Sequence, residues 1–219
     1  KKQIQGPTYK GPIHYINYAE LVGDSLMHIV HGDTSTVRAT TDIMEYHTKA
    51  VATGAPNAFI IADMPFMTAN ISASEALDTA RRLLQAGAHA VKCEVLDANL
   101  EIVNRLVNEG CLVMGHIGCC PQTVVKDGGY VVHGADATSR YNLMSLASAL
   151  STIGVMGIVL EKVAMTTAKA ITESVTCPTI GIGSGPDCSG QVLVTHDLLG
   201  LTPNFNPQFD SVDDLKQTT

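Results

Sequence analysis

Residues 72–94 read SASEALDTARRLLQAGAHAVKCE, and this stretch predicts a helix followed by a short strand. Ser72 and Glu75 have the spacing of a capping box, and the apolar residues after them recur every three or four positions, as on one face of a helix. Gly87 occupies the position at which helices commonly end. A short, mostly apolar run, Ala90–Glu94, comes next. A helix that leads into a buried strand is the repeating unit of a parallel α/β sheet.

The same alternation continues along the rest of the chain. Helical periodicity returns after Asp97, over Ser139–Thr152 and over Met165–Val175. Further strand-like runs lie at 19–23, 58–62, 111–115, 157–161, 179–183 and 191–194. A closed (β/α)₈ barrel needs one strand more than these runs supply. The missing first strand is either hidden in Pro12–Asn17 or belongs to a shortened first βα unit, and a doubly wound open sheet is the structural alternative.

Length, composition and charge exclude several classes of protein. A chain of 219 residues with 45% hydrophobic residues is long enough for one sizeable domain, which we expect to span residues 1–219. A net charge of −7, with 5% aromatic residues and no Trp, argues against nucleic-acid binding. The apolar runs are too short to span a membrane, and no secretory segment opens the chain. Six Cys without a C-x-x-C pair indicate reduced thiols.

Polar residues follow almost every predicted strand, and parallel strands present these ends at one edge of a sheet. Any one of them could simply cap a helix or close a turn. Several carboxylates gathered at one edge repel each other unless a cation lies among them, and oxygen ligands suit Mg²⁺ or Mn²⁺. The pattern therefore predicts a metal-assisted enzyme that acts on a small anionic oxo acid. The residues are Asp24, Ser25, Asp63, Lys92, Glu94, His116, Glu161, His196 and Asp197.

Two further motifs have competing interpretations. The glycine-rich segment 181–185 could cradle a phosphate, but it lacks the lysine of a P-loop, and a tight turn after a strand is the simpler reading. His116 with Cys119 and Cys120 could bind a soft metal, although a buried pair of thiols is the favoured interpretation.

Ten segments in order resemble the ketopantoate hydroxymethyltransferase (3-methyl-2-oxobutanoate hydroxymethyltransferase) family, and they extend over about residues 20–205. They are LVGDSL (21–26), YHTKAV (46–51), ADMPFM (62–67), AVKCE (90–94), MGHIG (114–118), PQTV (121–124), GGYVVHG (128–134), IVLE (158–161), IGIGSG (180–185) and GQVLVTHD (190–197). The resemblance implies a (β/α)₈ TIM barrel of the phosphoenolpyruvate/pyruvate superfamily.

The resemblance also implies a reaction and a role for each site residue. A hydroxymethyl group passes from 5,10-methylenetetrahydrofolate to 3-methyl-2-oxobutanoate and gives 2-dehydropantoate, in pantothenate biosynthesis. Asp24 and Asp63 hold Mg²⁺ with Glu94 beside it, Glu161 is the general base, and the substrate-binding residues are Asp24, Ser25, Asp63, Lys92 and His116. Relatives of this kind are homo-oligomers, usually decamers, that are cytoplasmic in bacteria and mitochondrial in many eukaryotes.

Departures from the family pattern keep two alternatives open. Met27 and the pair Val95–Leu96 stand where the family usually has glycine, and Cys119–Cys120 replace a Leu-Thr pair. Bulky residues at small positions could narrow the cleft. One alternative is a metal-dependent 2-oxo-acid lyase or aldolase of the same superfamily, and the other is a non-catalytic relative that acts as a scaffold.

Overall fold

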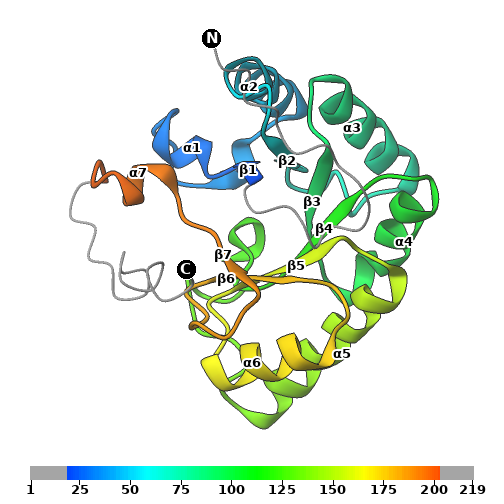
Figure 1. Ribbon diagram of the computed structural model, residues 1–219, viewed down its shortest axis with the longest axis vertical. Coiled ribbons are helices and arrows are strands. Elements are labelled where there is room, and N and C mark those ends of the chain that lie inside the picture. Colours follow the sequence, from blue (N-terminus) through cyan, green and yellow to red (C-terminus); the bar gives the residue numbers. More distant parts are fainter. Residues whose placement is uncertain (1–18, 203–219) are drawn as a thin grey trace, which may run out of the picture. The chain divides into compact units, whose positions relative to one another are not determined.

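The computed structural model of the protein describes residues 19–202, which form two compact units. The first unit holds the chain up to Cys93 together with Ile102–Val113, and the second holds Glu94–Glu101 together with the chain from Met114 onward. Within each unit, short parallel strands alternate with helices (Figure 1). The predicted α/β class is therefore confirmed.

The sheet of the first unit consists of three parallel strands. They are β1 (Ala19–Val22), β2 (Phe59–Asp63) and β3 (Ala90–Glu94), of which the last residue belongs to the second unit. β2 lies between its neighbours, with Ile61 opposite both Leu21 and Ala90. Strands that are neighbours in the sheet are thus neighbours along the chain, as successive βα units require.

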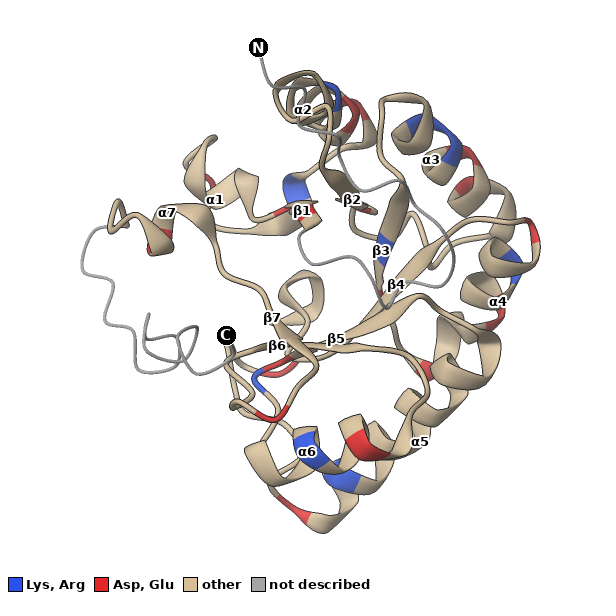
Figure 2. Ribbon diagram, viewed as in Figure 1, with Lys and Arg blue, Asp and Glu red and all other residues tan. Residues whose placement is uncertain are grey.

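The helices of the first unit cover this sheet. They are α1 (Leu26–Ile29), the 3₁₀ turn η2 (Thr36–Arg38), α2 (Thr41–Gly54), α3 (Ala73–Gln85) and most of α4 (Leu100–Asn108). Figure 1 shows α2 and α3 side by side, and Figure 2 shows that both carry charges of both signs. Arg82 of α3 pairs with Asp42 and Glu45 of α2. Helix α2 was not predicted from the sequence.

Helix α3 forms as its sequence predicts. The Oγ of Ser72 accepts a hydrogen bond from the backbone N–H of Glu75 at 3.2 Å, which satisfies one of the free donors at the helix start. Its apolar stripe buries Ala80 and Leu83 completely. Gly87 follows the helix with φ +112°, a left-handed conformation that suits glycine.

The second unit has four parallel strands in chain order. They are β4 (Val113–Gly118), β5 (Gly157–Glu161), β6 (Thr179–Ile182) and the short β7 (Gly190–Gln191), and the first residue of β4 belongs to the first unit. Glu161 lies opposite both Gly118 and Ile182. The helices are η3 (Asp97–Asn99), η4 (Pro121–Thr123), α5 (Ala137–Ile153), α6 (Met165–Ser174) and α7 (Thr195–Leu198).

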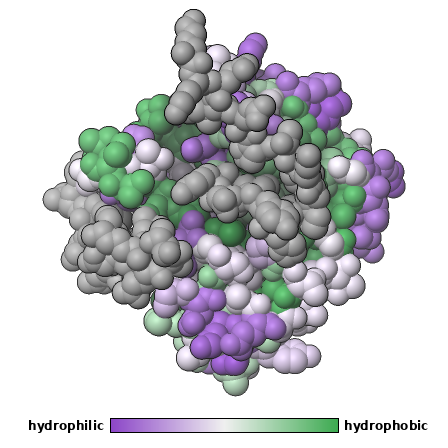
Figure 3. Space-filling model, viewed as in Figure 1, coloured by the Kyte–Doolittle hydropathy of each residue, from purple (hydrophilic) through white to green (hydrophobic). Residues whose placement is uncertain are grey.

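The core of the second unit lies between its strands and the helices α5 and α6. Asp136 caps α5 by accepting the N–H groups of Thr138 and Ser139, and Gly154 ends the helix with φ +88°. The large fully buried side chains here include Leu150, Ile158, Leu160 and Ile171. Helix α7 buries none of its residues, and Figure 3 shows hydrophobic surface over it.

The seven strands predicted from the sequence are all present in residues 19–202. Two predictions had wrong boundaries. The run 111–115 predicts a strand that ends before His116, but β4 continues to Gly118 and includes His116. The run 191–194 shares only Gln191 with β7, which ends at that residue. The strand expected in Pro12–Asn17, which would complete a closed barrel, lies outside the described residues. Between Ala19 and Thr202, no helix has the length and apolarity needed to cross a membrane.

Candidate active site

Asp24, Asp63 and Lys92 come together at the carboxyl ends of the strands of the first unit. Asp63 ends β2 and lies opposite Lys92 of β3. Its Oδ1 is 3.0 Å from the Nζ of Lys92, and its Oδ2 accepts a hydrogen bond from the backbone N–H of Asp24 at 3.0 Å. The side chains of the ion pair are only 5% and 7% exposed, so each charge depends on the other for its stability.

Ser25 joins this cluster through the turn that follows β1. A Cβ placed on Gly23 would lie 3.0 Å from the Oγ of Ser25 and 3.7 Å from the Oδ2 of Asp63. Glycine therefore leaves room for the hydroxyl and the carboxylate at the end of the strand. Gly23 was not predicted as a site residue, although its place directly before Asp24 in a strand-end turn was a usable clue.

Glu94, His116 and Glu161 come together in the second unit. The Nε2 of His116 is 3.3 Å from the Oε2 of Glu161, and its Nδ1 is 4.0 Å from the Oε1 of Glu94. The imidazole is 2% exposed, whereas the side chain of Glu161 is 16% exposed. His116 thus lies between two carboxylates, and of these three groups Glu161 is the one most open to solvent.

A backbone N–H and a side-chain amide hold Glu94 in place. The N–H of Gln122, in η4, donates to both carboxylate oxygens of Glu94 at 3.2 Å. The side chain of Asn99 donates to the carbonyl of Glu94 at 3.0 Å. Neither Gln122 nor Asn99 was predicted. The backbone N–H of Gln122 leaves no trace in residue type, and Asn99 contacts the backbone rather than the carboxylate of Glu94.

The peptide around Glu161 is braced by the glycine-rich segment 181–185. The buried hydroxyl of Ser184 donates to the carbonyl of Leu160 at 2.7 Å and accepts the N–H of Val163 at 3.0 Å. A Cβ on Gly118 would lie 2.3 Å from the carbonyl oxygen of Glu161. These contacts support the interpretation of 181–185 as a structural turn.

The remaining candidates take structural positions. Cys119 and Cys120 are buried, and all six cysteines are free, as predicted. Burial, with the charge of Glu161, raises the pKa of the Cys119 thiol to about 11. His196 and Asp197 lie in α7, where Asp197 accepts a hydrogen bond from Thr202.

Asp24 and Asp63 have the chemistry to hold a divalent cation. Their carboxylates offer oxygen donors, and Mg²⁺ is commonly bound by one or two carboxylates while water and substrate complete its shell. Within residues 19–202, no group of three or more His, Cys, Asp or Glu side chains is arranged as a metal site. Because the donors of Asp24 and Asp63 are carboxylate oxygens, they suit a hard, water-retaining cation better than zinc.

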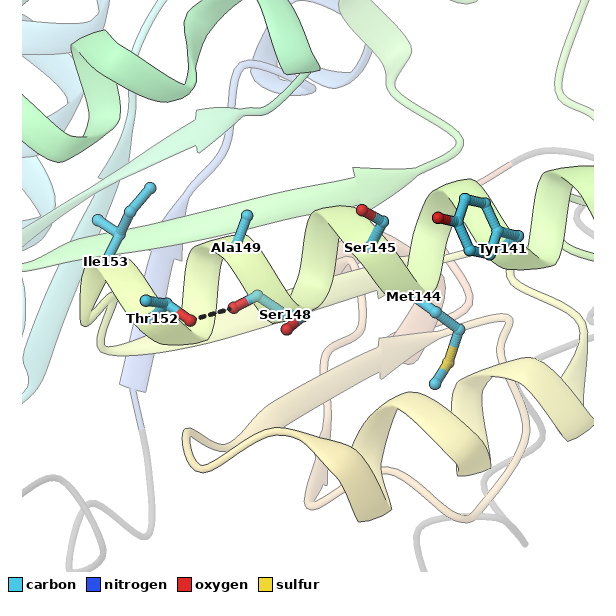
Figure 4. A pocket seen from close by; sticks show the side chains of 7 residues that line it. All are labelled: Tyr141, Met144, Ser145, Ser148, Ala149, Thr152 and Ile153. Carbon is cyan, nitrogen blue, oxygen red and sulfur yellow. Dashed lines mark hydrogen bonds between the residues drawn. The ribbon is translucent and has the colours of Figure 1, made fainter.

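A shallow hollow of about 680 Å³ lies on the outer face of α5. Figure 4 shows that the side chains that line it all come from this helix, from Tyr141 to Ile153. None of the predicted site residues lines it, so this hollow is not the candidate active site.

Comparison with known proteins identifies the family. The family model for ketopantoate hydroxymethyltransferase matches residues 15–216. The chain belongs to the ketopantoate hydroxymethyltransferase family. The 3-methyl-2-oxobutanoate hydroxymethyltransferase of Legionella pneumophila (strain Corby) is 47% identical over 190 residues, which are 86% of this chain and 72% of that protein. The enzyme of the same name from Thermotoga neapolitana is 50% identical over 189 residues, which are 86% of this chain and 70% of that protein.

Solved structures with low sequence identity support the fold. Phosphoenolpyruvate phosphomutase from Streptomyces platensis subsp. rosaceus aligns with a TM-score of 0.60 at 12% identity, over 82% of this chain and 70% of that one. A 2,3-dimethylmalate lyase of the PEP mutase/isocitrate lyase superfamily aligns with a TM-score of 0.51 at 15% identity, over 74% and 58% of the two chains. The family predicted from the ten motifs is confirmed, and the two solved structures share the α/β fold of this chain.

Proposed function

We propose that this enzyme transfers a hydroxymethyl group from 5,10-methylenetetrahydrofolate to 3-methyl-2-oxobutanoate, giving 2-dehydropantoate for pantothenate biosynthesis. The observation that carries the proposal is the contact between Glu161 and His116. A carboxylate at a strand end, partly open to solvent and 3.3 Å from a buried imidazole, has the position of a general base. The relatives named for this reaction are 47% and 50% identical to the chain.

In the proposed site, Asp24 and Asp63 would hold Mg²⁺, and Glu94 would add a further carboxylate for it. When bound, the cation would polarise the 2-oxo group of the substrate and so make its C3 proton more acidic. Ser25 and Lys92 contact the keto acid, together with Asp24, Asp63 and His116. Lys92 also offsets the charge of Asp63, with which it is paired at 3.0 Å.

Glu161 removes the C3 proton, and the electron pair of that C–H bond passes into the enolate. Water hydrolyses the N–CH2–N bridge of the folate, so both C–N bonds break, tetrahydrofolate leaves and the one-carbon unit remains as formaldehyde. C3 then bonds to the formaldehyde carbon, whose oxygen takes up a proton and becomes the hydroxyl group of the product, so the reaction needs no oxidant or reductant. His116 fixes the orientation of the Glu161 carboxylate and, through its other nitrogen, faces Glu94.

The wider features of the enzyme belong to the same proposal. We propose the closed (β/α)₈ barrel of the superfamily as a single domain, a homo-oligomer that is decameric by family resemblance, and a cytoplasmic location (mitochondrial in a eukaryote). The lyase and scaffold alternatives rested on Met27, Val95 and Leu96, and the scaffold alternative rested also on the first strand, which lies outside the described residues. Met27 and Val95 are 3% and 1% exposed, so core packing accounts for both.

The test is to incubate the protein with Mg²⁺, 3-methyl-2-oxobutanoate and 5,10-methylenetetrahydrofolate and to measure 2-dehydropantoate. The Glu161→Gln variant should lower kcat about 100-fold or more, because it removes the base. Glu173→Gln, an exposed carboxylate of α6, is the matched control. Exchange of the C3 proton with D₂O, followed by NMR without folate, measures the first step alone.

Two results would contradict the proposal. The first is that a folded wild-type protein with Mg²⁺ forms no product. The second is that Glu161→Gln turns over at the wild-type rate. If C3 exchange proceeds but no product forms with folate, the lyase or aldolase alternative is favoured instead.

A further inference from the structure

The segment between η4 and α5, residues 124–134, presents an unusual amount of apolar side chain to solvent. Its exposed residues are Val125 (86%), Tyr130 (49%), Val131 (42%) and Val132 (49%). Gly128, Gly129 and Gly134 in the same segment have positive φ. A contiguous group of exposed apolar side chains commonly marks a site that binds a ligand or another protein.

Lys162 connects this loop to the general base. Its Nζ lies 5.4 Å from the centre of the Tyr130 ring and donates to the carbonyl of Tyr130 at 3.5 Å. The backbone N–H of His133 donates to the carbonyl of Lys162 at 2.9 Å. Because Lys162 directly follows Glu161, these contacts hold the Tyr130 ring to the peptide that carries the base.

The backbone of Lys162 is itself strained. Its φ of +47° places a non-glycine residue in the left-handed region, which costs free energy and is concentrated at functional sites. The contacts on both sides keep it there, since its N–H donates to the carbonyl of Ile182 at 2.9 Å. The strained conformation directs a cationic side chain to the aromatic ring of the loop.

We infer that Tyr130 and Lys162 bind the one-carbon donor. This inference rests on the proposed function and adds to it the residues that contact the second substrate. The donor is a molecule of flat aromatic rings with a carboxylate tail. The face of Tyr130 offers a stacking surface for a ring, and Lys162 offers the opposite charge to an anion. A donor held here would have its reactive carbon near Glu161, where the nucleophilic carbon of the keto acid forms.

Four variants test the inference. Tyr130→Ala removes the stacking surface, and Tyr130→Phe restores the ring. Lys162→Asn removes the charge with a residue that tolerates positive φ better than most. Tyr141→Ala is the matched control, since Tyr141 is 73% exposed on α5 and lines the separate hollow of Figure 4. The KM for 5,10-methylenetetrahydrofolate and the KM for 3-methyl-2-oxobutanoate are measured separately, and calorimetric titration with tetrahydrofolate measures binding without turnover.

Tyr130→Ala should raise the folate KM about tenfold, as expected for the loss of one aromatic stacking contact. Tyr130→Phe should recover most of the affinity, and Lys162→Asn should weaken folate binding. The KM for the keto acid should change less than about twofold in each.

An active enzyme in which Tyr130→Ala leaves the folate KM unchanged, or raises both KM values equally, overturns the inference and leaves the proposed function intact. A wild-type protein that neither exchanges the C3 proton nor forms product overturns the proposed function, and the inference with it.

Discussion

Ser184→Ala tests whether the segment 181–185 positions Glu161. The Ser184 side chain is 1% exposed, and it forms hydrogen bonds with the chain just before and just after the base, Glu161. Its hydroxyl donates to the carbonyl of Leu160, one residue before Glu161, and accepts the N–H of Val163, two residues after it. Alanine keeps the backbone and removes both bonds, so the peptide that carries Glu161 loses its brace.

The size of the effect follows from burial. Leu160 and Val163 are 0% and 1% exposed, so water cannot readily replace the lost hydroxyl at either bond. Each buried polar group that loses its partner costs about 1–3 kcal/mol. Because relaxation recovers part of this, we expect the free energy of unfolding to fall by about 2–4 kcal/mol. A shift of the carboxylate by a fraction of an ångström should also lower kcat by about 10- to 100-fold.

The measurement is urea unfolding followed by circular dichroism, combined with steady-state kinetics. Ser145→Ala, an exposed serine of α5, is the control and should stay within about 0.5 kcal/mol of wild type. The KM for the keto acid should change little in Ser184→Ala, because Ser184 is not placed at the substrate. Wild-type stability and wild-type kcat in Ser184→Ala would refute the reasoning, and lower stability with unchanged kcat would limit the brace to a structural role.

Three further predictions concern buried groups. Lys92→Met leaves the carboxylate of Asp63 without its cation and should lower the free energy of unfolding by about 3–5 kcal/mol, as measured by urea titration. A loss below about 1 kcal/mol would show that the ion pair is not essential for stability. Gly118→Ala should abolish activity and lower Tm, because its Cβ would lie 2.3 Å from the carbonyl of Glu161, and a soluble variant with wild-type kcat would contradict this. Burial raises the pKa of the Cys93 thiol from 9.0 to about 12. Iodoacetamide at pH 8 should therefore alkylate Cys93 at least about 1,000-fold more slowly than a free thiol. Fast labelling of Cys93 in the folded protein would disprove this prediction. Since the folded pKa is the higher one, the stability that Cys93 contributes is complete below pH 9 and should decline as the pH rises toward 12.

The fold could be predicted where local sequence and burial agree. Helix α3 has a capping serine, a buried stripe and a terminal glycine, and all three lie within one short stretch. Helix α2 lacks this agreement, because only Met44 and Thr48 are buried among its 14 residues. Such a helix is held by contacts with its neighbours, including the ion pairs from Arg82, and these are not visible in its own periodicity.

The end of β4 illustrates a second limit of sequence patterns. An apolar run predicts that a strand stops at the first polar residue, so His116 was placed beyond it. In the structure His116 lies inside β4, opposite Val159 of β5, and its ring is buried. A polar side chain can occupy a buried strand position when carboxylates partner it, and the partners, Glu94 and Glu161, lie far from it in sequence.

The candidate site could be predicted only in part for a related reason. Acidic and basic side chains at strand ends identified Asp24, Asp63, Lys92, Glu94 and Glu161 as residue types suited to the chemistry. The groups that orient them are the N–H of Gln122 and the hydroxyl of Ser184, 28 and 21 residues away from the groups with which they pair. Any residue but proline has a backbone N–H, and serine is common in turns, so neither stands out in a sequence.

The strand β3 shows why the segment AVKCE is so informative. Side chains alternate between the two faces of a strand, so Lys92 and Glu94 leave it on one face and Cys93 on the other. Cys93 meets the Sδ of Met64 at 3.2 Å in the apolar interior of the first unit, while Lys92 reaches Asp63. A shift of β3 by one residue against β2 would bring Lys92 to the apolar face and leave the charge of Asp63 uncompensated. Lys92, a site residue, and Cys93, a core residue, therefore specify the same register of β3 against β2. For this reason one short segment predicts both the fold and the chemistry.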